Sequence, residues 1–444
     1  MHVELLIHAD WIIPVDADNR TLVNHSLAIN DGRIIAVLPR QDAVAQLNAA
    51  TVVELPGHVL IPGLINAHTH AAMSLLRGLA DDLPLMTWLN QHIWPAEQRW
   101  VDPSFVADGT QLAIAEMLRG GVTCFNDMYF FPEITAQVAA EAGMRLVAGM
   151  IVVDFPTRYA ADADCYLQRG LELHEQYRGH SLVTTAFAPH SPYTVSDTAL
   201  MRVRDLANKL DVPIHIHLHE TSDEITQALK TQGKRPLACL DQMGLLNPHL
   251  MAVHMTQLDD HEIVRLAATG AHVIHCPESN LKLASGFCPV MKLQRAGVNV
   301  ALGTDGAASN NDLNMLGELR TAALLAKGVS GDAAALPAPQ ALRMATINAA
   351  QALGISANTG SLEISKAADV VAIDLRDPHT QPLYHPSSQL VYAASSHQVR
   401  QVWINGRQVV RDGAVTTLAM DSLLTRVQAW QEKIAAGDEA LSIE

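Results

Sequence analysis

The sequence predicts an α/β fold, namely a (β/α)8 TIM-like barrel with a small β-sandwich domain formed from the N- and C-terminal segments. Between residues 59 and 365, apolar segments alternate with helix-period stretches or long loops, a pattern typical of parallel strands joined by helices. Residues 1–58 and 366–444 instead contain short alternating runs broken by Asp-Gly, Pro and Gly. No Gly-rich phosphate motif favours an open doubly wound sheet.

The barrel strands are expected where apolar runs are bounded by turn residues. Between them lie amphipathic stretches such as FVADGTQLAIAEMLRGG and DTALMRVRDLANKLD, whose apolar residues repeat with helical spacing. The expected strands are residues 60–67, 122–126, 146–153, 183–188, 214–218, 251–253, 272–275 and 298–302.

Composition narrows the class of protein. The 444 residues are 49% hydrophobic and carry a formal charge of −16, which argues against nucleic acid or an anionic membrane as a partner. Five cysteines lie scattered without CxxC spacing, as expected in a reducing compartment. The N-terminus has no basic region before an apolar run, and no stretch of 18 apolar residues occurs. We therefore expect a cytoplasmic protein.

Histidines and carboxylates follow the expected strands, at the end of a barrel where chemistry gathers. His68 and His70 come after the first strand, and their i, i+2 spacing turns both toward the same face. An isolated HxH pair is more often two ordinary loop histidines, but here several other expected strands are also followed by polar residues. These are His190, then His215, His217, His219 and Glu220, then His254, then Ser279 and Asn280, and finally Asp305.

Several motifs in this order resemble the amidohydrolase superfamily. PGLINAHTH resembles its strand-one signature, GTDGA its strand-eight signature, and GSLEISKAADVVAID its return into the β domain, with Ser365 where the family often has Gly. The stretches RGLADDLPLMTWLNQHIWPAE, APHSPYT, HIHLHETSDE and CPESNLKLASG are similar to the branch that deaminates 5′-methylthioadenosine and S-adenosylhomocysteine.

The resemblance implies a mononuclear metal centre, with zinc favoured over iron or manganese because imidazoles and one carboxylate suit that ion. The implied ligands are His68, His70, His217 and Asp305. His215 and His219 are the alternatives to His217, which the family pattern favours because Glu220 then lies three residues on. Binuclear relatives use a lysine where this chain has His190, so we expect one ion per chain.

The implied reaction is hydrolytic loss of the 6-amino group of an adenosine-type nucleoside. Asp305 would accept a proton from the attacking water, and Glu220 would protonate N1 of the purine. His254 would orient the water and stabilise the developing charge. An alternative interpretation makes Glu220 an ordinary first-turn carboxylate of the following helix.

Substrate choice is expected to depend on the loop after the first strand. The resemblance implies that Trp88 forms an apolar wall, Glu97 accepts the 2′- and 3′-hydroxyls of ribose, and His190 contacts the purine side. From residues alone, Trp88 would be core and Glu97 a first-turn helix carboxylate. Arg158 is a weak candidate for binding an amino-acid carboxylate, and no arginine pair stands out. That favours 5′-methylthioadenosine over S-adenosylhomocysteine.

Two other functions compete with this one. A related amidohydrolase could act on guanine, a pterin or a triazine, and a non-catalytic barrel could serve in assembly. An assembly protein should lack some ligands, whereas this chain has all four together with Glu220 and His254. The expected partners are a small nucleoside substrate and further copies of this chain, in a dimer or tetramer, with no nucleic acid and no membrane.

Overall fold

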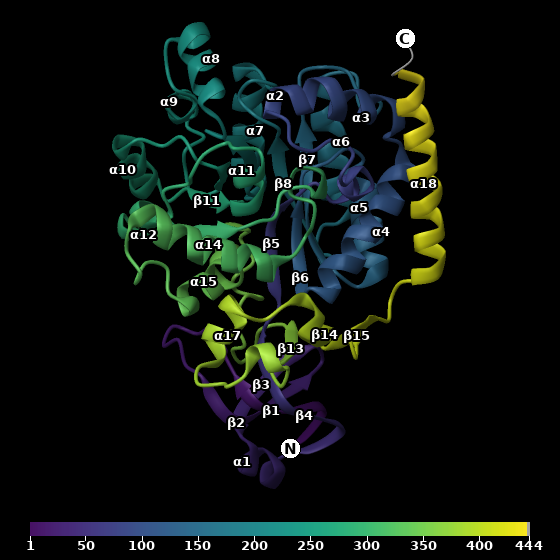
Figure 1. Ribbon diagram of the computed structural model, residues 1–444, viewed down its shortest axis with the longest axis vertical. Helices are drawn as coiled ribbons and strands as arrows, with labels where there is room; N and C mark the ends of the chain where they lie inside the picture. Colours follow the sequence, from purple (N-terminus) through teal and green to yellow (C-terminus); the bar gives the residue numbers. More distant parts are fainter. Residues whose placement is uncertain (442–444) are drawn as a thin grey trace. The chain divides into compact units, whose positions relative to one another are not determined.

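The protein, in a computed structural model that describes residues 1–441, divides into two compact units (Figure 1). The first comprises residues 1–66, 117–124 and 314–417; the second comprises residues 67–116, 125–313 and 418–441. These units follow spatial contacts, so the sequence boundaries expected after residues 58 and 365 stay a prediction.

The two ends of the chain build one sheet in the first unit. Its eight strands are ordered β16-β15-β14-β13-β4-β1-β2-β3. Strand β4 is parallel to β1 on one side and antiparallel to β13 on the other, so it joins the N-terminal strands to the C-terminal ones. The strands are β1 (His2–Ile12), β2 (Leu22–Asn30), β3 (Arg33–Pro39), β4 (Asn48–Pro62), β13 (Val370–Asp374), β14 (Val399–Ile404), β15 (Arg407–Arg411) and β16 (Ala414–Val415). The predicted small β domain is confirmed.

A compact apolar core stabilises this sheet. Ile7, Leu27, Ile34 and Leu60 are fully buried there, and the indole of Trp403 packs among them. Each such aliphatic side chain contributes about 1.5–3 kcal/mol when it is removed from water. The alternating runs of the two termini therefore belong to one core although they lie far apart in the sequence.

The second sheet is the predicted barrel. Its strands follow chain order from β5 to β12, and the pairs from β7 to β12 are parallel. The amide of Asp305, after the last strand, donates to the carbonyl of His68 in the first at 3.0 Å. The strands are β5 (Leu64–Thr69), β6 (Val122–Asp127), β7 (Arg145–Val152), β8 (Val183–Pro189), β9 (Ile214–Leu218), β10 (Leu250–His254), β11 (His272–His275) and β12 (Val300–Leu302).

The first barrel strand begins later than expected. Residues 60–62 belong to β4 of the terminal sheet, and β5 starts at Leu64. Gly63 separates them, and its amide donates to the carbonyl of Asp369 at 3.0 Å instead of joining the barrel. One continuous apolar run thus supplies strands to two sheets, a division that hydrophobicity alone does not mark.

Helices connect the strands and begin where the sequence offers capping side chains. Ser196 and Thr221 accept from the amides of Ala199 and Glu224, as N-cap residues do. No helix of the described residues is both long and apolar enough to cross a membrane. The helices are α1 (Arg40–Gln46), α2 (Leu85–Trp88), α3 (Trp94–Trp100), α4 (Pro103–Arg119), α5 (Pro132–Ala142), α6 (Ala163–Gln176), α7 (Asp197–Leu210), α8 (Ser222–Gln232), α9 (Pro236–Gln242), α10 (Asp260–Thr269), α11 (Pro277–Lys282), α12 (Val290–Arg295), α13 (Ala307–Asn310), α14 (Met315–Ser330), α15 (Ala338–Met344), α16 (Ile347–Ala352), α17 (Pro386–Tyr392), α18 (Met420–Leu441), the π-helix η2 (Leu89–Ile93), and the 3-10 turns η1 (Ala71–Leu76), η3 (Pro378–Thr380) and η4 (Ser396–Gln398).

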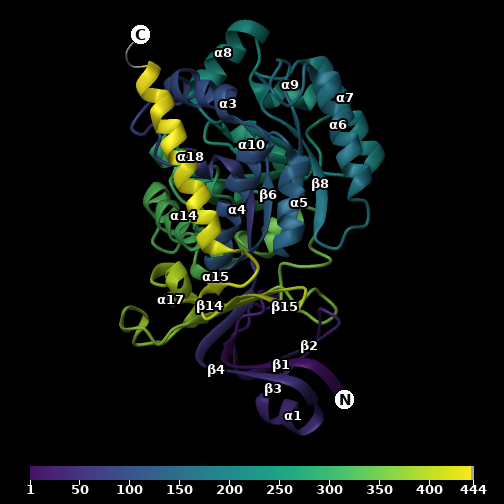
Figure 2. The same ribbon diagram turned by 90° about the vertical axis from the view of Figure 1, so that its right-hand side faces the viewer.

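The last helix, α18, lies in the second unit, alongside α3 and α4 (Figure 2). Its Arg426 donates from Nε to Oδ1 of Asp108 in α4 at 2.7 Å. The sequence pattern places this segment in the terminal β domain, because composition alone does not mark the helix on which it packs.

Gly303 allows the last strand to approach the first. A Cβ at this position would lie 2.7 Å from the His68 amide nitrogen and 3.1 Å from its Cα. Because these are backbone atoms, we expect Gly303→Ala to lower the free energy of unfolding by about 1–3 kcal/mol. Scanning calorimetry would detect this as a lower Tm. Gly328→Ala is the matched control, since a Cβ there meets nothing within 4 Å; equal Tm values for the two variants would contradict the prediction.

Candidate active site

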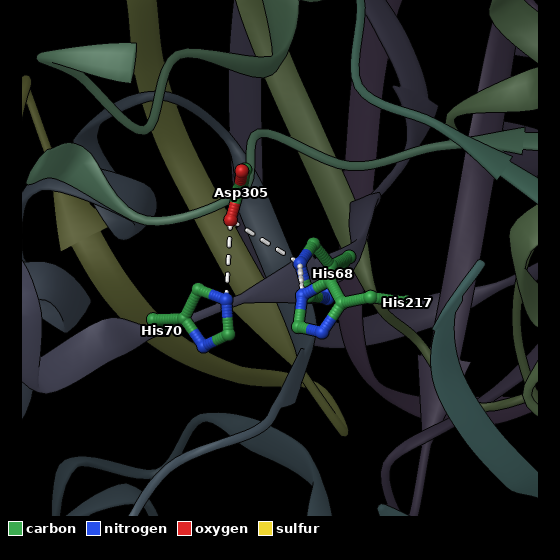
Figure 3. A group of neighbouring side chains, drawn as sticks. All are labelled: His68, His70, His217 and Asp305. Carbon is green, nitrogen blue, oxygen red and sulfur yellow. Dashed lines mark hydrogen bonds and ion pairs between the residues drawn. The ribbon is translucent and has the colours of Figure 1, made fainter. Parts of the chain in front are cut away.

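Four side chains converge at the carboxyl ends of the barrel strands. Their ligating atoms lie within 4.8 Å of one another, and the residues are His68, His70, His217 and Asp305. One Asp305 carboxylate oxygen lies 3.2 Å from Nε2 of both His68 and His70, while Nε2 of His217 lies 3.2 Å from that of His68 (Figure 3). The structure thus brings His217, and neither His215 nor His219, into this cluster.

The chemistry of this cluster fits a divalent metal ion. Burial lowers the pKa of His68 to about 4 and that of His217 far below its usual value, so both imidazoles keep a lone pair at neutral pH. Burial would raise the pKa of Asp305, but hydrogen bonds and charge from His68 and His70 hold it well below its usual range. Three imidazoles and one carboxylate form a donor set that zinc accepts.

His70 differs from the other two histidines in its electrostatics. Burial favours its neutral form, yet the hydrogen bond and charge of Asp305 outweigh burial and raise its pKa to about 9. A metal ion must therefore displace a proton from this imidazole, because only the neutral ring can act as a ligand. Metal affinity is expected to increase with pH.

A second layer of groups orients the cluster. His68 Nδ1 lies 2.8 Å from Nε2 of His215, whose Nδ1 lies 3.1 Å from the Asn126 amide nitrogen. His70 Nδ1 lies 2.6 Å from the carbonyl of Met128. Such contacts fix the ring orientation of a metal ligand, so the buried His215 supports His68.

The remaining ligands are held in the same way. His217 Nδ1 lies 2.8 Å from the carbonyl oxygen of His190, which leaves Nε2 directed at the cluster. The Ser279 hydroxyl donates to the second carboxylate oxygen of Asp305 at 2.7 Å. Ser279 follows strand β11, where the sequence had shown a polar residue without assigning it a role.

Glu220 and His254 lie beside the cluster, as the sequence analysis expected. His254 Nε2 lies 3.9 Å from a Glu220 carboxylate oxygen, and His254 Nδ1 lies 2.8 Å from Asn280 Oδ1. Burial raises the pKa of Glu220, although the charge of His254 opposes this shift. A carboxyl group that stays protonated at higher pH than usual can act as a general acid.

The backbone adopts left-handed conformations at three strand ends of this site. His219, His254 and Asp305 have φ of +54°, +74° and +66°. Such angles are uncommon for residues other than glycine, and they cluster at functional sites where the surrounding structure holds them. At His219 that support includes Glu224, whose carboxylate accepts from the amides of His219 and Glu220 at 3.0 and 2.7 Å.

A cavity of about 670 Å³ opens onto the cluster, and all three predicted substrate-binding residues line it. Trp88 and Glu97 come from the segment of α2, η2 and α3, and His190 follows strand β8. The π-helix η2, a type of helix often found at functional sites, ends at Ile93, and Pro95, which lacks an N–H, is the second residue of the helix α3 that follows. Burial lowers the pKa of His190 to about 3, so this imidazole is neutral.

Tyr129 is a cavity residue that the sequence analysis missed. It follows strand β6, is 4% exposed, and its ring centroid lies 6.5 Å from that of His70. Burial raises the pKa of Glu97 to about 7, while the neighbouring Tyr129 hydroxyl and the charge of His70 act in the opposite direction. The segment NDMYF, in which polar Asn126 and Asp127 end the second barrel strand, was the signal that could have identified Tyr129.

The profile of the Amidohydrolase family matches residues 59–409, which include every residue of the site. The chain belongs to the amidohydrolase family. Two relatives, each named 5-methylthioadenosine/S-adenosylhomocysteine deaminase, are 50% identical to it: one from Saccharophagus degradans over 98% of this chain and 97% of the relative, and one from Teredinibacter turnerae over 98% of both.

Solved structures agree with this assignment. A zinc-bound adenosine deaminase from Xanthomonas campestris is 51% identical, with a TM-score of 0.97 over 98% of this chain and 99% of that one. Atrazine chlorohydrolase from Arthrobacter aurescens shares the fold of this amidohydrolase at 23% identity, with a TM-score of 0.90 over 96% of this chain and 100% of the other. The predicted family and barrel fold are confirmed.

Removing one imidazole should abolish metal retention. We expect His70→Ala to lose the bound ion during gel filtration, because three donors remain where four converge. Metal analysis of the purified protein measures the stoichiometry, with exposed His261→Ala in helix α10 as the control. A His70→Ala protein that keeps its full metal content and activity would refute the assignment.

Proposed function

We propose that this amidohydrolase is a hydrolytic deaminase of adenosine-type nucleosides. It converts the 6-amino group of 5′-methylthioadenosine, and of adenosine or S-adenosylhomocysteine to a lesser extent, to the 6-oxo group with release of ammonia. The observation that carries this proposal is the arrangement of Glu220, His254 and the metal cluster around one cavity that Glu97 also lines. The names of the relatives that are 50% identical support it.

One zinc ion per chain is proposed as the cofactor, held by His68, His70, His217 and Asp305. A bound metal ion lowers the pKa of a water ligand to about 7 and so supplies a nucleophile at neutral pH. Support for zinc comes from the donor set and from the zinc-bound deaminase that is 51% identical.

The chain's own residues move the protons. Protonated Glu220 donates from its carboxyl group to N1 of the purine, which makes C6 electrophilic. Asp305 accepts the proton lost by the attacking water on its carboxylate, which the Ser279 hydroxyl holds by a hydrogen bond of 2.7 Å to the second oxygen. His254, fixed through Nδ1 by Asn280, directs Nε2 at the oxygen that attacks C6.

The balance of the reaction follows from these transfers. A C6–O bond forms as the water loses its proton to Asp305, and the C6–N bond then breaks. The amino group takes that proton as it leaves, so ammonia departs neutral. The proton that Glu220 gave to N1 stays on the 6-oxo product. The second proton of the water leaves the C6 oxygen as the C6=O bond forms and returns to the Glu220 carboxylate, which restores the acid for the next turnover.

The cavity lining suits a neutral 5′-substituent. It includes the apolar side chains of Leu85, Phe155 and Pro156. Arg158 also lines the cavity, and its guanidinium donates to the carbonyl of Arg99 at 3.2 Å. A methylthio group matches this lining better than an amino-acid zwitterion does.

We propose that the protein is cytoplasmic and assembles with further copies of itself. None of the five cysteines forms a disulfide in the described structure, which suits a reducing cytoplasm. The family resemblance supports a homodimer or homotetramer. The formal charge of −16 does not favour nucleic acid as a partner.

The test is ammonia release by the zinc-loaded protein from 5′-methylthioadenosine, S-adenosylhomocysteine, adenosine and adenine side by side. We expect fast turnover of 5′-methylthioadenosine, slower turnover of the other nucleosides, and none of adenine. Activity on adenine alone would remove the role of Glu97. No release from any of the four by protein with metal bound would overturn the proposal and direct the search to guanine, pterins and triazines.

Glu220 should be needed for chemistry and not for metal binding. Gln cannot donate a carboxyl proton to N1, so we expect Glu220→Gln to lower kcat by about 10²–10⁴-fold with the metal content unchanged. Glu172→Gln, at a surface position of helix α6, is the matched control. A Glu220→Gln protein with near-normal kcat would show that the proton comes from elsewhere.

Nucleoside affinity should fall on the acid side of neutrality. Glu97 must be ionised to accept two ribose hydroxyls, and its pKa is raised to about 7, so the acceptor is lost as pH falls through that value. We expect KM for 5′-methylthioadenosine to rise by up to about tenfold per pH unit below 7. The 2′,3′-dideoxy analogue should lack this dependence, and the same acid limb for both substrates would contradict the role of Glu97.

A further inference from the structure

The C-terminal helix α18 contacts the outer side of α3, the short helix that carries Glu97. Arg99 of α3 donates from Nη1 to the carbonyl of Gly437 in α18 at 2.9 Å. The guanidinium carbon of Arg99 lies 4.7 Å from the ring centroid of Trp100, and Lys433 Nζ of α18 lies 5.1 Å from the same ring. Arg99 and Trp100, two and three residues after Glu97, are thus both in contact with α18.

Helix α18 is itself anchored to α4. Trp430 Nε1 donates to Asp108 Oδ2 at 2.9 Å, and its ring packs edge-on against Phe105 at 5.3 Å between centroids. Arg426 donates to the other oxygen of Asp108 at 2.7 Å. Lys433 Nζ lies 4.2 Å from the Trp430 centroid and so bridges the two contacts. Because these interactions fix α18 along its length, its last turns can act as a rigid support.

Gly437 fits against α3 without space for a side chain. A Cβ there would lie 2.5 Å from Trp100 Cζ2 and 3.1 Å from the guanidinium carbon of Arg99. Glycine inside a helix costs about 0.5–1 kcal/mol relative to alanine, and here it permits the close contact between the two helices. Because the contact is this close, a methyl group added at Gly437 would displace the Trp100 ring.

Glu97 is sensitive to such a movement. Its carboxylate lies in the cavity, while Arg99 and Trp100, at the end of the same seven-residue helix, lie against α18. A short helix moves as one body, so a displacement at Trp100 is transmitted to Glu97.

We propose that α18 is a positioning element for the ribose site: its contact with Arg99 and Trp100 holds α3 so that Glu97 meets the 2′- and 3′-hydroxyls of the substrate. The inference rests on the proposed nucleoside deaminase function and extends it to a helix outside the cavity. It assigns to Gly437 and Arg99 an effect on substrate discrimination, through Glu97 and without contact with the substrate.

The test compares Gly437→Ala and Arg99→Met with Gly328→Ala, a glycine-to-alanine change inside another helix where a Cβ meets nothing within 4 Å. For Gly437→Ala we expect KM for 5′-methylthioadenosine to rise roughly 10–100-fold with kcat within about threefold of the wild type. Arg99→Met should act in the same direction without introducing a clash. Neither variant should alter KM for the 2′,3′-dideoxy analogue, or the metal content.

Hydrogen–deuterium exchange gives a readout that does not depend on activity. We expect amides of residues 94–101 to exchange faster in Gly437→Ala and Arg99→Met than in wild type or Gly328→Ala. Unchanged exchange in this segment, or equal KM increases for the nucleoside and its dideoxy analogue, would overturn the inference. Absence of any nucleoside turnover by the wild type would instead overturn the proposed function, and the exchange data would still decide whether α18 holds α3.

Discussion

The site depends on one buried carboxylate. Asp305 is 5% exposed and lies within 3.2 Å of two imidazole nitrogens, at the point where the last barrel strand meets the first. A carboxylate in such a place is very unfavourable unless positive charge or hydrogen bonds compensate for lost water. His68, His70 and Ser279 provide that compensation, and the same geometry leaves the donor atoms directed at one point. The stability of the carboxylate and the capacity to bind a metal ion thus have one origin.

The barrel supplies the remaining constraint. Parallel strands deliver their carboxyl ends to one side, so residues separated by more than two hundred positions in the chain become neighbours. At His219, His254 and Asp305 the chain leaves its strand in a left-handed conformation, which turns it sharply into the following loop. Glu224, Asn280 and Ser279 then hold the adjacent side chains or turns. The candidate site thus combines left-handed strand ends with polar contacts that hold the neighbouring side chains and turns.

Sequence reasoning predicted the parts of this arrangement that have local signals. His68 and His70 follow an apolar run at strand spacing, and Asp305 follows another, so topology alone placed them together. The choice of His217 as the ligand needed the family resemblance. His215, His217 and His219 alternate along the sequence HIHLH, so on an isolated strand all three face the same way. The contact between His68 Nδ1 and His215 Nε2 shows why His215 supports the site instead of entering it.

Contacts between residues that are distant in the chain could not be predicted from the sequence. The role of Tyr129 depends on how β6 lies beside the segment that carries Glu97, and the contact of Gly437 with Trp100 joins positions 337 residues apart. One apolar run is divided at Gly63, whose amide donates to the carbonyl of Asp369, and no local sequence pattern predicts this hydrogen bond. In each case the deciding partner is distant in the chain, and neither periodicity nor composition encodes it.

The most direct test of the central claim is diffraction from crystals of the zinc-loaded protein, recorded on both sides of the zinc absorption edge. The account predicts a single anomalous peak per chain, within ligand distance of His68, His70, His217 and Asp305. Two peaks in the cavity, or one peak outside this cluster, would contradict a mononuclear centre built on the buried carboxylate.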